Sequence, residues 1–211
     1  MPDFEIERRH LDAGRRLIAG VDEAGRGALC GPVVAAAVLL PTGWFSGSHP
    51  DWVGRIDDSK RLSPRERSFL ARAIRREAVY GLGLAAPAEI DAVNILHASR
   101  EAMRRAVEAL SAPPDIILLD GLPFDGFARP REAVVGGDRR SISIAAASIL
   151  AKVCRDRMMT LAGCRYPGYG IERHKGYGTR GHYEALARLG PTPFHRKSFK
   201  LQYQAKLFES P

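Results

Sequence analysis

The hydrophobic positions of this chain fall into short runs that end in glycine or in polar residues. Short apolar runs bounded by such residues predict strands. Residues 17–21 and 33–40 are two such runs joined by a glycine-rich turn, which predicts two neighbouring strands. Further runs at 79–85, 116–119 and 133–135 predict a third, a fourth and a short fifth strand. The segment 41–60, rich in glycine and proline, predicts a loop. The run at 116–119 is continuously apolar, which is typical of a strand buried on both faces.

Apolar residues at helical spacing separate these strands. Ser63, Pro64 and Glu66 predict a helix start, because serine caps the first turn, proline fits the first helical position and glutamate completes a capping box. The side chains that this helix is expected to bury are Phe69, Leu70, Ala73 and Ile74. The other predicted helices cover 1–16, 88–110, 141–159, 180–189 and 199–208. Alternating strands and helices predict an α/β domain with a mixed central sheet, followed by a basic helical C-terminal region.

Length and composition limit the class of protein. The chain has 211 residues, of which 45% are hydrophobic, so we expect one domain with a substantial core. No apolar run approaches the roughly 18 residues of a membrane helix, and the start of the chain lacks the apolar stretch of a secretory signal. We therefore expect a cytoplasmic monomer without a membrane segment. The three cysteines, Cys30, Cys154 and Cys164, are too few and too widely spaced to predict a zinc site or a disulfide framework.

The formal net charge of +8 favours a polyanionic partner. This excess is concentrated near the C-terminus, since residues 139–206 are rich in lysine and arginine while their acids are only Asp156, Glu172 and Glu184. The basic C-terminal region is therefore expected to contact phosphates.

Four acids follow or end predicted strands, beside glycine or polar turns: Asp22, Glu23, Asp120 and Asp138. Strand ends are where α/β proteins usually carry their chemistry. Neighbouring side chains of an ideal strand point to opposite faces, so a turn of the chain would be needed for Asp22 and Glu23 to share one site. Clustered carboxylates repel one another, and Mg²⁺ or Mn²⁺ would relieve that repulsion. Two such ions about 3.5–4 Å apart support phosphodiester hydrolysis, although an Asp-Gly pair after a strand is also a common turn.

Several motifs, in order along the chain, resemble those of the bacterial ribonuclease HII family. They begin with Gly20-Val21-Asp22-Glu23-Ala24-Gly25-Arg26-Gly27 and Gly31-Pro32-Val33, followed by Asp58-Ser59-Lys60 and Gly137-Asp138. They continue with residues 144–156, with His174-Lys175-Gly176-Tyr177-Gly178-Thr179, with His182, and with His195-Arg196 before Ser198-Phe199. The ordered matches cover about 18–199, most of the chain.

The resemblance implies a ribonuclease H-like mixed sheet flanked by helices, in a single catalytic domain over 1–211. Its core would cover about 17–163, and its helical substrate-binding region about 164–208. It also implies an endonuclease that hydrolyses the RNA strand of RNA–DNA hybrids and nicks 5′ of ribonucleotides embedded in duplex DNA. The products would carry 5′-phosphate and 3′-hydroxyl ends. By the same resemblance, Asp22, Glu23, Asp120 and Asp138 hold Mn²⁺ or Mg²⁺.

Further residues match the family's substrate contacts. The segment Gly25-Arg26-Gly27 matches the one that reads the ribose 2′-hydroxyl, where glycines permit close backbone approach. Tyr177 matches a tyrosine that bonds the same hydroxyl and stacks on the next sugar. The family often carries Asp-Gly-Asn, where this chain has Leu122 after Asp120-Gly121. Four basic residues could contact phosphates, but they could equally be solvated or structural charges: Lys60, Lys152, Lys175 and Arg196.

Other side chains and functions are left as alternatives. His174, His182 and His195 lack the spacing of a metal triad, so packing or phosphate contact is favoured. Asp156 is more easily explained by a salt bridge or cap than by a role at the metals. The rival functions are a nucleic-acid-binding protein without catalysis and a nuclease or strand-transfer enzyme that does not check the ribose. A ribonuclease HIII is less favoured, because only 16 residues precede the first predicted strand.

Overall fold

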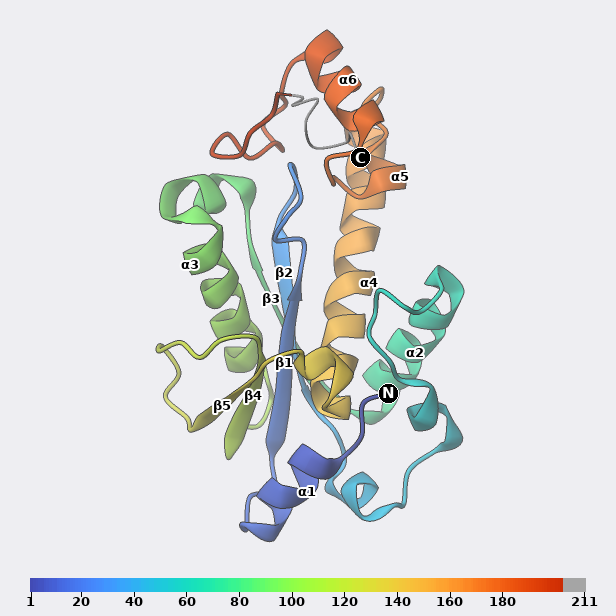
Figure 1. Cartoon of the computed structure of the whole chain (residues 1–211), viewed down its shortest axis with the longest axis vertical. Helices are drawn as coiled ribbons and strands as arrows, with labels where there is room; N and C mark the ends of the chain where they lie inside the picture. Colours follow the sequence, from blue (N-terminus) through green and yellow to red (C-terminus); the bar gives the residue numbers. More distant parts are fainter. Residues whose placement is uncertain (203–211) are drawn as a thin grey trace, which may run out of the picture.

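A five-stranded sheet forms the centre of the computed structural model, which describes residues 1–202 (Figure 1). Its strands are β1 (Ile18–Ala24), β2 (Val33–Leu39), β3 (Val79–Ala85), β4 (Ile116–Asp120) and β5 (Arg131–Val134). Their order across the sheet is β3-β2-β1-β4-β5. The first three strands pair antiparallel, whereas β4 runs parallel to both β1 and β5. The predicted mixed central sheet is therefore confirmed.

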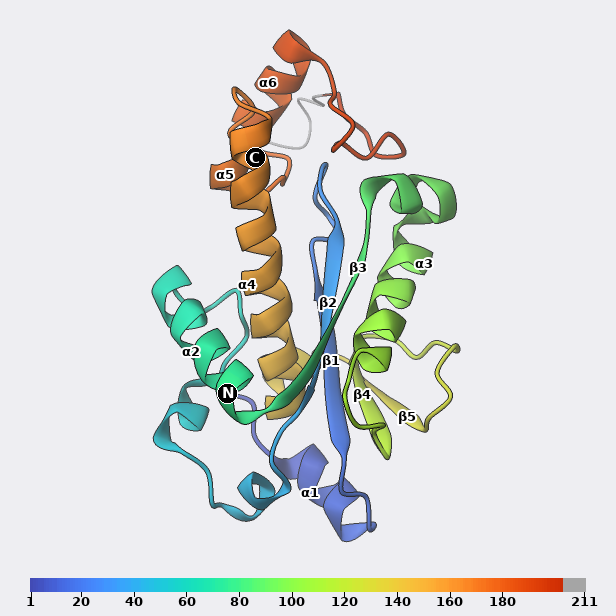
Figure 2. The same ribbon diagram turned by 180° about the vertical axis from the view of Figure 1, so that it is seen from behind.

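Helices cover both faces of this sheet. The long helix α4 (Ile142–Arg165) and the shorter α2 (Pro64–Glu77) lie on one face, and α3 (Pro87–Glu108) lies on the other (Figures 1 and 2). Successive strand residues belong to different cores: Ile18 packs with the α4 side, and Ala19 and Val21 pack with the α3 side. Because helices cover both faces of β1 and β4, both strands contain continuous apolar runs in the sequence.

Close packing of α4 on β1 depends on small residues. Ala145, Ala146 and Ala147 are fully buried. A Cβ on Gly20 would lie 2.1 Å from the backbone carbon of Ser143, so only glycine leaves room for α4 at this point. The start of α4 is also capped, since the Ser141 hydroxyl accepts a hydrogen bond from the Ile144 amide.

The predicted helix over 88–110 is interrupted at Asn94. This residue has φ 68° and ψ 166°, which is not helical. Its side-chain oxygen accepts hydrogen bonds from the amides of Leu96 and His97, so it caps a new helical segment. The apolar spacing continues across the break, and for that reason the periodicity alone predicts one helix.

Two other expectations are corrected by the packing. The segment 41–60, predicted as a loop, contains two 3₁₀ helices, η1 (Thr42–Ser46) and η2 (Asp51–Arg55), which add Phe45 and Trp52 to the core. Phe69, predicted to be buried, is exposed on α2 and is covered on one side by the Arg55 guanidinium.

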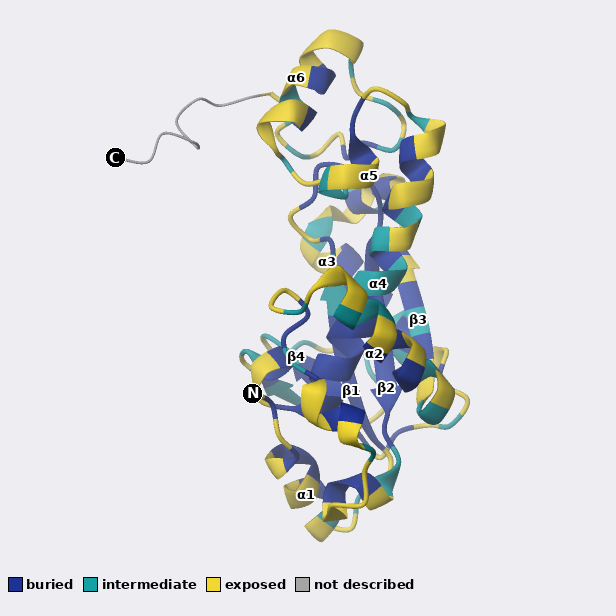
Figure 3. Cartoon of the chain, turned by 90° about the vertical axis from the view of Figure 1, so that its right-hand side faces the viewer, coloured by how far each residue is buried: buried dark blue, intermediate teal, exposed yellow. Residues whose placement is uncertain are grey.

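Three short helices lie outside the sheet, near the two ends of the described residues. Helix α1 (Glu5–Asp12) forms the predicted N-terminal arm, and α5 (Ile171–His174) and α6 (Arg180–Leu189) lie beside the far end of α4. Helix α4 is buried in its first half and becomes partly exposed towards these helices (Figure 3). The helix predicted over 199–208 is not formed at 199–202, and its remainder lies outside the described residues. No helix within residues 1–202 is long and apolar enough to cross a membrane.

We predict that Gly20→Ala destabilises the fold. The added methyl group would overlap the backbone of α4, and overpacking of this kind lowers the free energy of unfolding by about 1–3 kcal/mol or more. Chemical denaturation followed by circular dichroism measures the change. Gly54→Ala is the matched control, because a Cβ there meets nothing within 4 Å. An equal loss of stability in both variants would contradict the packing argument.

Candidate active site

The parallel pairing of β1 and β4 brings two of the predicted acids side by side. Val21 pairs with Leu119, and the next residues along the two strands are Asp22 and Asp120. Asp22 is almost completely buried. Its burial, together with the charges of Glu23 and Asp120, raises the pKa of the Asp22 carboxyl well above its ordinary value. The end of β1 therefore holds a carboxyl group whose ionised form is disfavoured by its surroundings.

Glu23 stays in the strand, because β1 continues through Ala24 instead of turning after the acids. Burial and the charge of Asp120 raise the pKa of the Glu23 carboxyl, while the Arg26 guanidinium opposes this effect. Arg26 Nη1 lies 3.2 Å from Glu23 Oε1. The chain thus turns only at Gly25–Gly27, after both acids, and the charge of Asp120 acts on both of them.

Asp138 joins the group through a turn between β5 and α4. It lies in η3 (Gly137–Arg139), and the amide of Gly137 donates a 2.6 Å hydrogen bond to Asp120 Oδ1. Burial and the charges of Asp120 and Asp58 raise the pKa of the Asp138 carboxyl. Lys60 Nζ lies 3.6 Å from Asp138 Oδ2 and partly balances it. The four predicted acids therefore lie at one end of the β1–β4 pair, although within residues 1–202 no three of them bring their ligand atoms within 4.8 Å of one another.

Two polar residues complete the acid site without having been singled out from the sequence. Asp58 is buried and accepts a hydrogen bond from the Lys60 amide. Ser148 on α4 bonds to the Asp22 carboxyl, and its hydroxyl lies 2.9 Å from that of Ser59. The Asp58-Ser59-Lys60 motif was the feature of the sequence that could have indicated a role for Asp58 and Ser59 beside the acids.

A cavity of about 570 Å³ opens beside Asp22 and Glu23. The predicted substrate-contacting residues that line it are Gly25, Arg26, Gly27, Lys60, Lys152 and Tyr177. Gly25 has φ +98°, and a side chain there would collide with Arg155, so the loop needs glycine. Nothing lies within 4 Å of a Cβ built on Gly27, so the backbone there is open to a ligand.

The remaining predicted contacts lie elsewhere. Lys175 lines an adjoining groove and binds the Thr160 hydroxyl, with Nζ 2.7 Å from Oγ1. Arg196 is fully buried, and its guanidinium donates to backbone carbonyls, so the predicted phosphate contact is wrong. Lys152 pairs with Asp156 at 2.8 Å, which confirms the salt bridge preferred for that acid. Leu122, the departure from the family pattern, is 76% exposed.

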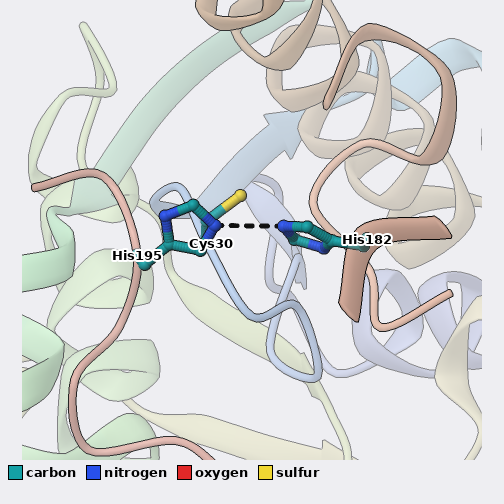
Figure 4. A group of neighbouring side chains, drawn as sticks. All are labelled: Cys30, His182 and His195. Atoms are coloured by element: carbon teal, nitrogen blue, oxygen red, sulfur yellow. Dashed lines mark hydrogen bonds between the residues drawn. The ribbon is translucent and has the colours of Figure 1, made fainter. Parts of the chain in front are cut away.

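A second polar cluster lies at the base of the C-terminal region. It consists of Cys30, His182 and His195 (Figure 4). Within residues 1–202, these are the three histidine, cysteine or acidic side chains whose possible metal-ligand atoms all lie within 4.8 Å of one another. The sequence did not predict that these three side chains lie together, because their positions are far apart in the chain. His182 Nε2 and His195 Nε2 are 3.1 Å apart, and the ring of His174 stacks on that of His182.

Comparison with known proteins agrees with this geometry. The family model described as ribonuclease HII matches residues 19–202. The chain belongs to the ribonuclease HII family. Ribonuclease HII of Moorella thermoacetica is 51% identical over 198 residues, which cover 93% of each chain. Membership confirms the resemblance found in the sequence and makes the protein a ribonuclease H, a hydrolase that cuts RNA in RNA–DNA hybrids.

Solved structures show the same fold. Ribonuclease H2 from Pyrococcus horikoshii is 26% identical, with a TM-score of 0.70 over 87% of this chain and 94% of that one. Ribonuclease HII from Archaeoglobus fulgidus, solved in complex with PCNA, is also 26% identical, with a TM-score of 0.67 over 91% of this chain and 100% of that one. Bst-RNase HIII, which is 17% identical with a TM-score of 0.55 over 82% of this chain and 70% of that one, shares the fold and was solved in complex with Mn²⁺.

We predict that His182 makes stability depend on pH. Burial lowers the pKa of His182 to about 4 from an ordinary value of 6.5, so between these values the unfolded chain binds more protons than the folded one. The free energy of unfolding therefore falls as the pH falls through this range. The free energy of unfolding can be measured with urea at pH values from about 7 to about 4. Its slope against pH should be smaller in His182→Gln than in wild type, by the equivalent of about one proton taken up on unfolding. The exposed His97→Gln is the control, and an unchanged pH dependence in His182→Gln would contradict the assignment.

Proposed function

We propose that this ribonuclease H also nicks duplex DNA on the 5′ side of a single embedded ribonucleotide. The observation that carries the proposal is that Asp22 and Glu23 share one cavity with the Gly25–Gly27 backbone and with Tyr177. A group that hydrolyses a phosphodiester and a group that can sense a 2′-hydroxyl are then within reach of one nucleotide. The products would be 5′-phosphate and 3′-hydroxyl ends.

The four acids fit the metal ions that the family uses. Asp22, Glu23, Asp120 and Asp138 offer the hard oxygen ligands that Mg²⁺ and Mn²⁺ prefer. Burial and mutual repulsion raise the pKa of Asp22, Glu23 and Asp138, which is the condition that a divalent cation relieves. We assign these four side chains as the metal ligands. The bound ions would supply activation of water and stabilisation of the leaving oxygen.

The protein's own groups position the substrate around these acids. Lys60 lies at the mouth of the cavity beside Asp138, with its side chain 79% exposed, and is placed to contact a phosphate. The open backbone at Gly27 allows a ribose to approach, and exposed amides there can bond its 2′-hydroxyl. Lys152 also lines the cavity, and its ammonium lies 5.7 Å from the centre of the Tyr177 ring.

Tyr177 completes the proposed ribose check. Its ring is 37% exposed at the cavity and lies over the Arg155 guanidinium at 5.4 Å. This contact restrains the ring, while the Tyr177 hydroxyl can bond a 2′-hydroxyl and the ring can stack on the following sugar.

The partner we propose is duplex nucleic acid, either an RNA–DNA hybrid or DNA that contains ribonucleotides. The groove next to the cavity is lined by Arg67, Arg157, Arg173 and Lys175, so positive charge continues from the site along α4 and α5. Such charge binds phosphates through release of counterions. We propose that the protein acts as a monomer in the cytoplasm.

We predict that Asp22→Asn and Asp120→Asn abolish nicking while binding survives. Loss of a ligand charge should reduce the rate by about 10²-fold or more, because the metals cannot then stabilise the reaction. Cleavage of a DNA duplex with one ribonucleotide in Mn²⁺, and binding of the same duplex, measure the two effects. Asp125→Asn is the control, since this acid is 95% exposed on the loop after β4. Near-normal cleavage by either active-site variant would refute the metal assignment.

We predict that Tyr177→Phe weakens recognition of a single ribonucleotide. Removal of one hydrogen bond to the 2′-hydroxyl should lower kcat/KM on that duplex by about 10-fold. Tyr80→Phe is the matched control, because Tyr80 is also 37% exposed but lies on the edge strand β3. If wild type cuts an all-DNA duplex as fast as one that contains a ribonucleotide, the ribose check does not exist.

A further inference from the structure

The segment 192–199, which we name the closing segment, packs against the β1–β2 loop (residues 25–32). The amide of Gly31 donates to the carbonyl of Phe194 at 2.8 Å, and the amide of Arg196 donates to the carbonyl of Leu29 at 2.9 Å. Beyond Arg196, the amides of Lys197 and Ser198 donate to the Asp91 carboxylate on α3. The closing segment thus reaches from α6 to the start of α3 across the β1–β2 loop (Figure 2).

Arg196 fixes the part of this loop that faces the cavity. Its guanidinium donates to three carbonyl oxygens: Gly31 at 3.0 Å, Arg26 at 2.8 Å and Gly25 at 2.7 Å. Each of these peptide groups is planar, so a fixed carbonyl also fixes the amide of the next residue. Arg196 therefore orients the amides of Arg26 and Gly27, although its own side chain is fully buried.

His195 ties the closing segment to the other side of the ribose site. The amide of Thr192 donates to His195 Nδ1 at 3.0 Å, which places the proton of the neutral ring on Nε2. That proton is donated to His182 Nε2 at 3.1 Å, and His182 Nδ1 then donates to the carbonyl of Tyr177 at 2.9 Å. These hydrogen bonds form a continuous chain from the closing segment to the backbone of Tyr177.

The same hydrogen-bond directions argue against a metal ion between Cys30, His182 and His195. A metal-bound histidine donates its other ring nitrogen proton, whereas His195 Nδ1 accepts from a backbone amide. The Arg155 and Arg196 guanidiniums also donate to backbone carbonyls around Cys30, including those of Cys30 itself and Gly31, and their charge disfavours a further cation. A shared proton fits this cluster better than a metal does.

We propose that His195 and Arg196 are positioning residues for recognition of the ribose 2′-hydroxyl. Arg196 holds the Gly25–Gly27 backbone, and His195 holds Tyr177 through His182, so one short segment sets the spacing between the two sides of the check. This inference rests on the proposed function, because it assigns the residues that prepare the same site.

The test is Arg196→Lys, because a single ammonium cannot bond three carbonyls in the directions that a guanidinium spans. We expect kcat on a single-ribonucleotide duplex to fall roughly 10- to 100-fold, as is usual for a misplaced recognition group. Binding of that duplex, compared between Asp22→Asn and the double variant Asp22→Asn with Arg196→Lys, should change less than about threefold. Hydrogen exchange of the amides of residues 26–28 should become faster.

Leu186→Ala is the control for general loosening of the C-terminal region. Leu186 is buried in the same hydrophobic cluster as Leu29 and Tyr169. If Leu186→Ala lowers Tm as much as Arg196→Lys but keeps kcat near that of wild type, the positioning role is supported. Equal losses of kcat in both variants, or unchanged exchange at residues 26–28 in Arg196→Lys, would overturn it. A wild type that does not nick the duplex would instead refute the proposed function, and the exchange measurement would still decide the role of Arg196.

Discussion

The parallel pairing of β1 with β4 is the constraint on which the active site depends. It places the buried Asp22 beside the partly buried Asp120. Burial and the charges of its acidic neighbours oppose ionisation of Asp22, and they raise the pKa of its carboxyl well above the ordinary value. The free energy for holding them there comes from the apolar packing of both sheet faces against helices. The fold thus keeps an arrangement of acids that the acids alone would not adopt.

A second principle of this structure is that buried positive charge is balanced by backbone carbonyls. Arg155 donates to the carbonyls of Pro32, Lys175 and Cys30, and Arg196 donates to three others in the β1–β2 loop. A loop has many carbonyls without strand or helix partners, and a buried guanidinium satisfies several of them at once. In this way side-chain hydrogen bonds hold an irregular segment in place, as the proposed contact of its backbone with a substrate requires.

Local patterns in the sequence were sufficient for much of the fold. The strands and the helix starts at Ser63 and Ser141 depend on neighbouring residues. The structure places β2, β3, β4 and both helix starts where the patterns indicated, whereas β1 continues to Ala24 and β5 covers Arg131–Val134 instead of 133–135. The break at Asn94 was missed because apolar spacing outweighed a single capping side chain. The core residues of 41–60 were missed because irregular backbone has no period.

The candidate site shows a similar division. The acids could be nominated because each ends or follows a strand, and the resemblance added the ribose-reading segment. The burial of Arg196 could not be foreseen, because an arginine that binds carbonyls and one that binds phosphate look alike in a sequence. The same holds for Cys30, His182 and His195, whose meeting depends on how α6 and the closing segment fold back.

The position of Arg196 in the chain has a consequence for biosynthesis. During translation the acids of β1 and β4, and the loop at 25–27, leave the ribosome long before the residue that fixes that loop. A nascent chain that ends before Arg196 therefore contains the four acids but lacks the guanidinium that bonds the carbonyls of Gly25, Arg26 and Gly31. With the role proposed for Arg196, such a chain carries cleavage groups before its recognition loop has been fixed.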